Sequence, residues 1–383
     1  MAETKAVPAL LRALNERTVL DVVRAAGPIS RAEVARQTGI SRPTVSLVLR
    51  SLLEDGLVRE TGHDPDRPHY GATYYEADPE AAVVLGVDFG ARSLRAAICD
   101  LNGEVRAQEA IRSRGPVAER IDVLAHTCRS LLRTSKLPPD LLENAVVALP
   151  AVVSPADGKV SSADLPGLAS ADLREQLERA LRVPVALEND VNLAALAEQR
   201  SGVAQGVADF AFLLVGAGLG AAVVLDWKLY RGHNGAAGEL DAVRSGRSDD
   251  ADPCAAAISR FAADAASGEP TVLEPPYEVS AIFAAARTGD AVAGAVVEET
   301  ARRIALHVLP LAATLDLPLV VLGGSLGANA DLLDPVRRHL EVWLPFPPRL
   351  EVSALGEAAV IEGALAAGVD AALERVFARR ARA

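Results

Sequence analysis

Residues 87–100, VDFGARSLRAAICD, consist of an apolar run, a sharp turn and a second apolar run. The turn contains an acid, Asp88, and two residues later a glycine, Gly90. Short apolar runs bounded by turn residues are typical of buried β-strands. The stretch therefore predicts a strand–turn–strand unit in which a carboxylate stands at the end of the first strand.

The segments that follow extend this unit into an α/β body. An Asn102-Gly103 turn predicts a hairpin from the second strand into a third. Helices are expected at about 118–135, directly after residue 188, and at about 329–342. Further strands are expected at 145–150, 183–188, 208–226 (interrupted by a glycine turn) and 317–323. Two glycine turns at strand ends in separate halves indicate two α/β lobes with a cleft between them.

The first 78 residues have a different pattern. Residues 9–27 place apolar side chains mainly at helical spacing and end at a Gly-Pro pair. Ser30 and Glu33 form a capping box at the start of a second helix, and Gly39 suits a tight turn after it. Ser41 is the expected N-cap of a third helix. This order predicts a helix-turn-helix unit.

The third helix divides into two faces. Val45, Val48, Leu49 and Leu52 share the face that should pack inward. The residues expected to contact DNA are Ser41, Arg42, Pro43, Thr44, Ser46 and Arg50. Small hydroxyl groups and arginines suit base edges and phosphates, and such helices usually enter the major groove N-terminus first. The alternative is a helical protein–protein module.

A wing is expected after the third helix. Residues 56–62 and 73–78 predict paired strands, and the segment between them carries Arg67, a further candidate DNA contact. His63 and His69 in the same segment fit solvated wing residues better than metal ligands.

Charge and cysteine content limit the class of protein. The 383-residue chain has a net charge of -12. Residues 1–75 hold ten Lys/Arg and nine Asp/Glu, which is +1 and leaves -13 for the rest. A nearly neutral head can approach phosphates while the acidic body stays in solution. Three separated cysteines without a CxxC pair, no long apolar run and no signal-peptide pattern predict a cytoplasmic protein.

The head and body together resemble the repressor, ORF, kinase (ROK) family, in its regulator branch. The resemblance rests on GVDFGA (86–91), ALPAVVSPADGKV (148–160), VPVALENDVNLAALAE (183–198), VGAGLGAAV (215–223), YRGHNGAAGEL (230–240) and VVLGGSL (320–326). It implies an N-terminal winged helix-turn-helix followed by a two-lobed, actin-like, ribonuclease-H-like sugar-kinase fold. The expected domains are residues 1–78, a first lobe of 79–193 plus 365–383, and a second lobe of 194–364.

The resemblance also implies a polyol pocket formed by Asn189, Asp190 and Glu239. Asp190 matches the base that takes the sugar hydroxyl proton in the family's kinases, and Glu239 matches a sugar ligand. A carboxylate where a strand meets a helix is well placed for that chemistry. From the residues alone, Asn189 or Asp190 could equally be a helix cap.

The departures from the kinase pattern argue against catalysis. The first phosphate turn, Asp88-Phe-Gly90-Ala-Arg92, has an arginine where the kinases have a compact hydroxyl residue. Arg92 either holds an anion such as a sugar phosphate or is a surface residue. The second turn, Gly216-Ala-Gly218, also lacks a hydroxyl group.

The zinc site of the family is incomplete in this sequence. Ala242 stands where the family's histidine belongs, and Cys254 is the one nearby cysteine. Because structural zinc takes four N or S ligands, we expect no metal. The neighbouring sugar contact that the family's histidine supplies is missing with it.

Three functions fit these observations. The first is a homo-oligomeric DNA-binding regulator, most simply a repressor, whose body senses a sugar or sugar phosphate without a cofactor. As a dimer it would place two third helices about 34–36 Å apart on a pseudo-palindromic operator. The second is an ATP-dependent sugar kinase with a regulatory head, in which Asp190 would be catalytic. The third is a regulator whose partner is a protein.

Overall fold

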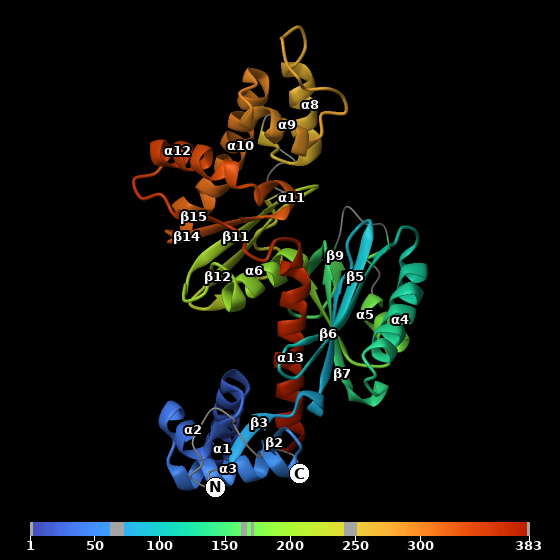
Figure 1. Ribbon diagram of the computed structural model, residues 1–383, viewed down its shortest axis with the longest axis vertical. Coiled ribbons are helices and arrows are strands. Elements are labelled where there is room, and N and C mark those ends of the chain that lie inside the picture. The colour runs from blue at the N-terminus through green and yellow to red at the C-terminus, as the bar shows by residue number, and fades with distance from the viewer. Residues whose placement is uncertain (1–2, 62–72, 162–166, 170–171, 241–250, 381–383) are drawn as a thin grey trace.

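The computed structural model describes residues 3–61, 73–161, 167–169, 172–240 and 251–380. A small N-terminal head lies at one end, two α/β lobes lie beyond it, and a long C-terminal helix runs from the lobes back to the head (Figure 1). The expected combination of a helix-turn-helix head and a two-lobed α/β body is confirmed.

The head contains three helices and a small sheet. Its elements are α1 (Glu3–Ala26), β1 (Ile29–Ser30), α2 (Arg31–Thr38), α3 (Arg42–Glu54), β2 (Val58–Thr61) and β3 (Tyr74–Ala77). Ser30 accepts a hydrogen bond from the Glu33 backbone N–H, and Gly39 ends α2 at φ +69°. The four apolar residues expected inside are the buried residues of α3. Arg67, His63 and His69 lie outside the described residues.

The first lobe is built on a mixed sheet with the order β10-β7-β4-β5-β6. Its strands are β4 (Val83–Asp88), β5 (Ser93–Asp100), β6 (Val105–Arg112), β7 (Leu142–Leu149) and β10 (Val185–Asn189). Helices α4 (Val117–Thr134) and α5 (Leu173–Leu181) supply apolar residues to the core on one face. The expected turn is present, because Gly103 (φ +83°) donates its N–H to Asp100 O at 2.9 Å.

The second lobe has a sheet with the order β13-β12-β11-β14-β15. Its strands are β11 (Phe210–Val215), β12 (Leu219–Leu225), β13 (Lys228–Leu229), β14 (Leu319–Gly323) and β15 (Arg349–Val352). Its helices are α8 (Ala255–Ala265), α9 (Val279–Arg287), α10 (Ala291–Leu315), α11 (Gly324–Gly327) and α12 (Leu333–Trp343). The helix expected from about 329 therefore begins at Leu333, after a short 3₁₀ turn at Ala330–Leu332.

Two helices connect the parts. Helix α6 (Asp190–Ser201) leaves the first sheet and packs on β11 and β12 of the second. Helix α13 (Ala359–Arg380) packs on β4 and β7 and then reaches the head (Figure 1). Its residues Val369 and Leu373 share one apolar core with Val23 and Leu52 of the head. The head therefore packs directly against the body.

No single helix within the described ranges is long and apolar enough to cross a membrane. Helices α9 and α10 pass that test only as a pair bent by 117°, and both contribute residues to the core of the second lobe.

Candidate functional site: the junction of the lobes and the DNA-reading head

Three carboxylates gather where the two lobes meet. Asp88 ends β4, Asp190 is the first residue of α6, and Glu239 follows Gly238 in a loop of the second lobe. The pKa of Asp190 is raised to about 7, first because protein atoms surround its carboxyl group and then because of the charge of Asp88. Glu239 raises it further, so the three acids lie close enough to repel one another.

Nearby hydrogen-bond donors and arginines only partly oppose the rise in the pKa values of Asp190 and Asp88. The Val191 backbone N–H donates to Asp190 Oδ1 at 2.9 Å and lowers the pKa of that carboxyl group. Burial also raises the pKa of Asp88, while the charges of Arg95 and Arg120 lower it. A cluster of acids with raised pKa values is a common mark of a binding or catalytic site.

Asn189 acts as the cap of α6. Its side-chain oxygen accepts from the Asn192 N–H at 3.1 Å, and its Nδ2 donates to Ala151 O at 3.2 Å. The capping alternative is therefore confirmed for Asn189, whereas Asp190 begins the helix proper. A ligand role for Asn189 remains a prediction and would use its remaining lone pair and N–H.

The loop that carries Glu239 is pressed against both lobes. A side chain at Gly238 (φ +88°) would meet Ala221 O at 1.8 Å, and one at Gly235 (φ +82°) would meet Val153 O at 2.1 Å. Val153 belongs to the short strand β8 (Val152–Val153) of the first lobe. These glycines are therefore required for the close approach of the loop, which fixes Glu239 at the junction.

An ion pair closes the same edge of the junction. Arg231 Nε of the second lobe donates to Glu188 Oε2 of the first lobe at 2.7 Å, and Arg231 Nη2 forms an ion pair with the same oxygen at 2.7 Å. The other oxygen, Glu188 Oε1, accepts from Asn192 Nδ2 at 2.9 Å. A cavity of about 420 Å³ lies beside this pair and extends to Ser154.

The first glycine turn is held by an arginine that the sequence reasoning missed. Arg92 is exposed, and no residue of the described segments forms an ion pair with it. Arg120 of α4 is 1% exposed, stacks 4.1 Å from the centre of the Phe89 ring and donates to Gly90 O. The helical spacing of Arg120 with the buried Leu124 and Leu131 was the available signal. A buried protein cation thus fixes the turn backbone.

The second glycine turn is tightly packed at its base. Gly216 donates its N–H to Gly218 O at 3.0 Å, and its carbonyl accepts from the Ala255 N–H at 2.9 Å. A side chain at Gly216 would meet Ser325 Oγ at 3.0 Å. The exposed Ser325, in a separate segment, therefore supplies a hydroxyl group next to this turn, which the sequence reasoning also missed.

Among the described residues near Cys254, no zinc site is formed. The Cys254 side chain is 3% exposed at the start of α8, and its backbone N–H donates to Asp252 Oδ1 at 2.9 Å. Ala242 lies outside the described residues. Within the described part of the chain, no group of three His, Cys, Asp or Glu residues could hold a metal ion.

The expected DNA contacts lie together on α3. Arg42, Pro43 and Arg50 are exposed, and Thr44 and Ser46 are half-buried. Ser41 Oγ accepts from the Thr44 N–H at 3.4 Å, which makes Ser41 the N-cap. The side chain of Leu47 is 64% exposed on the same face and was not among the expected contacts.

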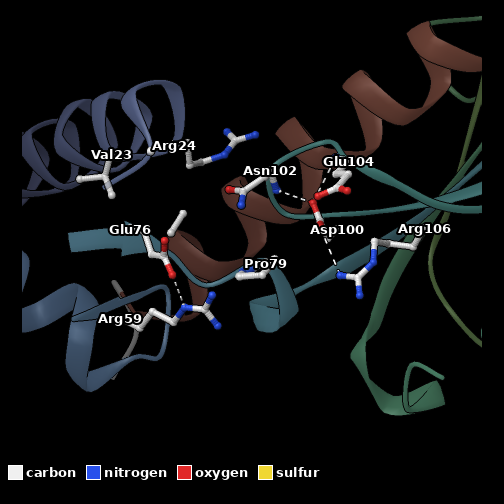
Figure 2. A pocket seen from close by; sticks show the side chains of 11 residues that line it. Val23, Arg24, Arg59, Glu76, Pro79, Asp100, Asn102, Glu104 and Arg106 are labelled. Atoms are coloured by element: carbon white, nitrogen blue, oxygen red, sulfur yellow. Dashed lines mark hydrogen bonds and ion pairs between the residues drawn. The ribbon is translucent and has the colours of Figure 1, made fainter. Parts of the chain in front are cut away.

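A polar cavity of about 330 Å³ lies between part of the head and the body (Figure 2). On the head side, Arg59 Nε donates to Glu76 Oε1 at 2.6 Å. On the body side, Asp100 is 1% exposed and accepts from Arg106 Nη1 at 3.4 Å. Arg24 enters from α1, and its buried Nε has no hydrogen-bond partner among the described residues.

A chain of charges links α6, α13 and the head. Arg200, in the last turn of α6, donates to Asp370 Oδ2 of α13 at 3.3 Å. The other oxygen of Asp370 lies 3.9 Å from Arg17 Nη2 of α1. Arg17 Nη1 also lies 3.9 Å from Glu374 Oε1. Because Asp190 is the first residue of α6 and Arg200 lies near its end, one helix joins the carboxylate cluster to the head.

A winged helix-turn-helix head on a two-lobed body with the sugar-kinase fold defines a class of transcriptional regulator. The family model described as the ROK family matches residues 84–371, and a MarR family model matches residues 13–67. This protein belongs to the ROK family.

Relatives and solved structures agree with that assignment. The xylose repressor of Caldicellulosiruptor bescii is 24% identical over 382 residues, covering 93% of this chain and 96% of the repressor. The DNA-binding transcriptional dual regulator NagC of Escherichia coli K12 is 25% identical, covering 77% and 76% of the two chains.

Among solved structures, a ROK family transcriptional regulator described as a homologue of the E. coli MLC protein superimposes with a TM-score of 0.78. It is 22% identical, and the match covers 97% of this chain and 99% of that one. A ROK family glucokinase from Streptomyces griseus, in complex with glucose and AMPPNP, gives a TM-score of 0.64 at 23% identity. That match covers 76% of this chain and 100% of the glucokinase.

Proposed function

We propose that this protein is a transcriptional repressor that binds operator DNA through α3 and senses a sugar or sugar phosphate at the junction of its lobes. The observation that carries the proposal is the joining of a helix-turn-helix head to a carboxylate cluster through α6 and α13 in one chain. The xylose repressor matches nearly the whole of this chain, and NagC matches about three quarters of it. The similarity to a xylose repressor supports a carbohydrate effector.

The carboxylate cluster suits a polyol. A sugar hydroxyl donates a hydrogen bond to a carboxylate, and it does so best when the carboxylate is ionised. With a pKa of about 7, Asp190 is half protonated near neutral pH without ligand. Hydroxyl donors from a sugar stabilise its charged form, so sugar binding and proton release from Asp190 are coupled.

The sugar acts on DNA binding by favouring one arrangement of the lobes. Asp190 and Glu239 stand on elements of different lobes, so a ligand that touches both binds best at one lobe spacing. Any shift of α6 moves Arg200 and strains its pair with Asp370, which also faces Arg17 of the head. In a homodimer the resulting tilt of the heads changes the spacing of the two α3 helices.

A phosphoryl-transfer activity is disfavoured by the two turns. Such catalysis depends on positioning and on stabilising charge at the transferred phosphoryl group. At the first turn, Arg92 replaces a compact hydroxyl residue and points to solvent, while the guanidinium of Arg120 is occupied with Gly90 O. Asp190 would be the base if the chain were a kinase. We therefore propose a regulator without this activity.

Two measurements separate the regulator from the kinase. An electrophoretic mobility shift with duplexes from the neighbourhood of the gene should give one retarded site, weakened by one sugar or sugar phosphate. A coupled ADP-release assay with pentoses, hexoses and amino sugars should show no turnover. Turnover in the usual kinase range of about 1–100 s⁻¹ would establish the second function instead. Failure to bind any of the duplexes would remove the first.

A further inference from the structure

A cationic groove lies on the outer face of the first lobe, away from the carboxylate cluster. It has a volume of about 770 Å³ and is formed by the C-terminal part of α4, the segment 136–142 and the segment 179–183. Its floor is apolar and includes the buried side chains of Leu132, Leu137 and Leu181. Its rim carries Arg129, Arg133, Lys136, Arg179 and Arg182 against one acid, Asp140.

These rim cations have no acidic partner in the part of the chain that the structure describes. No carboxylate of the described residues pairs with any of the five, although other arginines do pair, such as Arg231 with Glu188. Arg179 Nε donates only to the carbonyl of Glu175 in its own helix. Five cations and one acid give +4 locally in a chain whose net charge is -12.

Helix dipoles explain only part of this pattern. Arg133 and Arg179 lie in the last turns of α4 and α5, and Lys136 and Arg182 follow the ends of these helices, so the free carbonyl groups favour four of the five cations but not Arg129. That effect is confined to the last turn of each helix. It gives no reason for an apolar floor between the cations. The groove therefore combines two features that a free protein surface rarely keeps together, an apolar hollow and uncompensated charge of one sign.

We propose that this groove binds an acidic, leucine-rich segment of a partner protein. Apolar side chains of the segment would fill the floor, and its Asp or Glu residues would pair with the arginines of the rim. Complementary charge steers such partners together, and apolar side chains buried in the centre supply most of the affinity. A nucleic acid backbone would satisfy the cations but would leave the apolar floor exposed to water.

The groove is at the end of the first sheet that faces the head. Leu142, at the groove, pairs in register with Val83, and Val83 pairs with Asp100. Asp100 lines the cavity between head and body. A protein bound at the groove therefore lies at the end of the first lobe nearer the head and provides an input on DNA binding that is separate from the sugar.

The test uses the full-length protein and a short fluorescent peptide with glutamates on one helical face and leucines on the other. We expect a Kd of about 1–100 µM by anisotropy. The double charge reversal Arg129→Glu/Arg133→Glu should weaken binding at least about tenfold. Arg114→Glu, at an exposed site near the other end of α4, is the matched control and should leave the affinity unchanged.

Companion peptides decide the class of partner. Replacing the leucines by serines, or the glutamates by glutamines, should abolish binding. Equal binding of the serine peptide overturns the proposal, because the apolar floor then contributes nothing. Displacement of the peptide by operator-free duplex DNA, with the same loss in the double variant, assigns the groove to nucleic acid and also overturns it. Failure of the original peptide to bind the wild-type protein also overturns the proposal. If the double variant fails to fold, Lys136→Gln should give a smaller loss of the same sign.

Discussion

Replacing Asp190 by asparagine should stabilise the unliganded protein, and the gain should grow with pH. Burial and the charge of Asp88 raise the pKa of Asp190 from 3.8 to about 7. A carboxyl group whose pKa is raised on folding holds its proton longer in the folded state than in the unfolded state. Its contribution to stability is therefore most favourable below pH 3.8 and declines as the pH rises towards 7.

The size of the effect follows from the shift. About three pKa units correspond to roughly 4 kcal/mol at pH 8, and the partial exposure of the Asp190 residue to solvent reduces this to about 2–4 kcal/mol. The amide that replaces the carboxyl group in Asp190→Asn would keep an oxygen that accepts from the Val191 N–H but would carry no charge. Between pH 6 and pH 8 the free-energy gain of Asp190→Asn should increase by about 1 kcal/mol.

Urea unfolding of wild type and Asp190→Asn at pH 6, 7 and 8 measures this gain. Asp122→Asn, at an exposed position on α4, is the control and should show no gain that rises with pH. Equal stability of Asp190→Asn and wild type at pH 8 would refute the reasoning. A gain that stays constant with pH would assign it to packing instead of to the buried charge.

Arg120→Ala should destabilise the protein by about 2–4 kcal/mol, because Gly90 O loses its donor and a cavity opens beside Phe89. The control Arg129→Ala, on the exposed face of α4, should change the unfolding free energy by less than about 0.5 kcal/mol. Equal effects of the two substitutions would contradict this prediction. Asp370→Asn should change the unfolding free energy by less than about 1 kcal/mol, yet it should reduce the effect of the sugar on operator affinity, since it breaks the contacts of Arg200 and Arg17. The control Asp334→Asn, in a surface ion pair of α12, should preserve the effect of the sugar. A full sugar response in Asp370→Asn would exclude coupling through Arg200, Asp370 and Arg17. Arg42→Ala should weaken operator binding by about 1–3 kcal/mol if Arg42 reads a guanine; an unchanged mobility shift removes that contact.

The local elements were predictable because their causes are local. Hydrophobic periodicity predicted the strands around Asp88 and the buried face of α3. Serine side chains before two helices predicted the caps at Ser30 and Ser41, whereas the sequence left open whether Asn189 or Asp190 caps α6. The likeness to the ROK family placed Asp190 and Glu239 in one site, and their electrostatic coupling agrees with that placement.

The contacts that join the parts could not be derived in the same way. Arg120 looks like an ordinary helix residue until the fold brings it under the turn at Gly90. Val369 and Leu373 form part of a core with Val23, more than 300 residues earlier in the chain. Neither hydrophobic periodicity nor a capping residue indicates a contact between residues so far apart in the sequence, because such a contact depends on the complete tertiary structure. The expected boundary at residue 78 therefore gave no sign that α13 enters the core of the head.

The measurement that tests the central claim most directly is an operator-binding titration with and without sugars. Wild type and Asp190→Asn are compared by fluorescence anisotropy on one operator duplex at fixed salt, because affinity for DNA depends strongly on salt. One pentose, hexose, N-acetylhexosamine or corresponding phosphate should lower the wild-type affinity at least about tenfold, which is about 1.4 kcal/mol. Asp190→Asn should bind the duplex as tightly as wild type and ignore that compound. An equal response of both proteins, or no response of wild type to any of these compounds, would contradict the account.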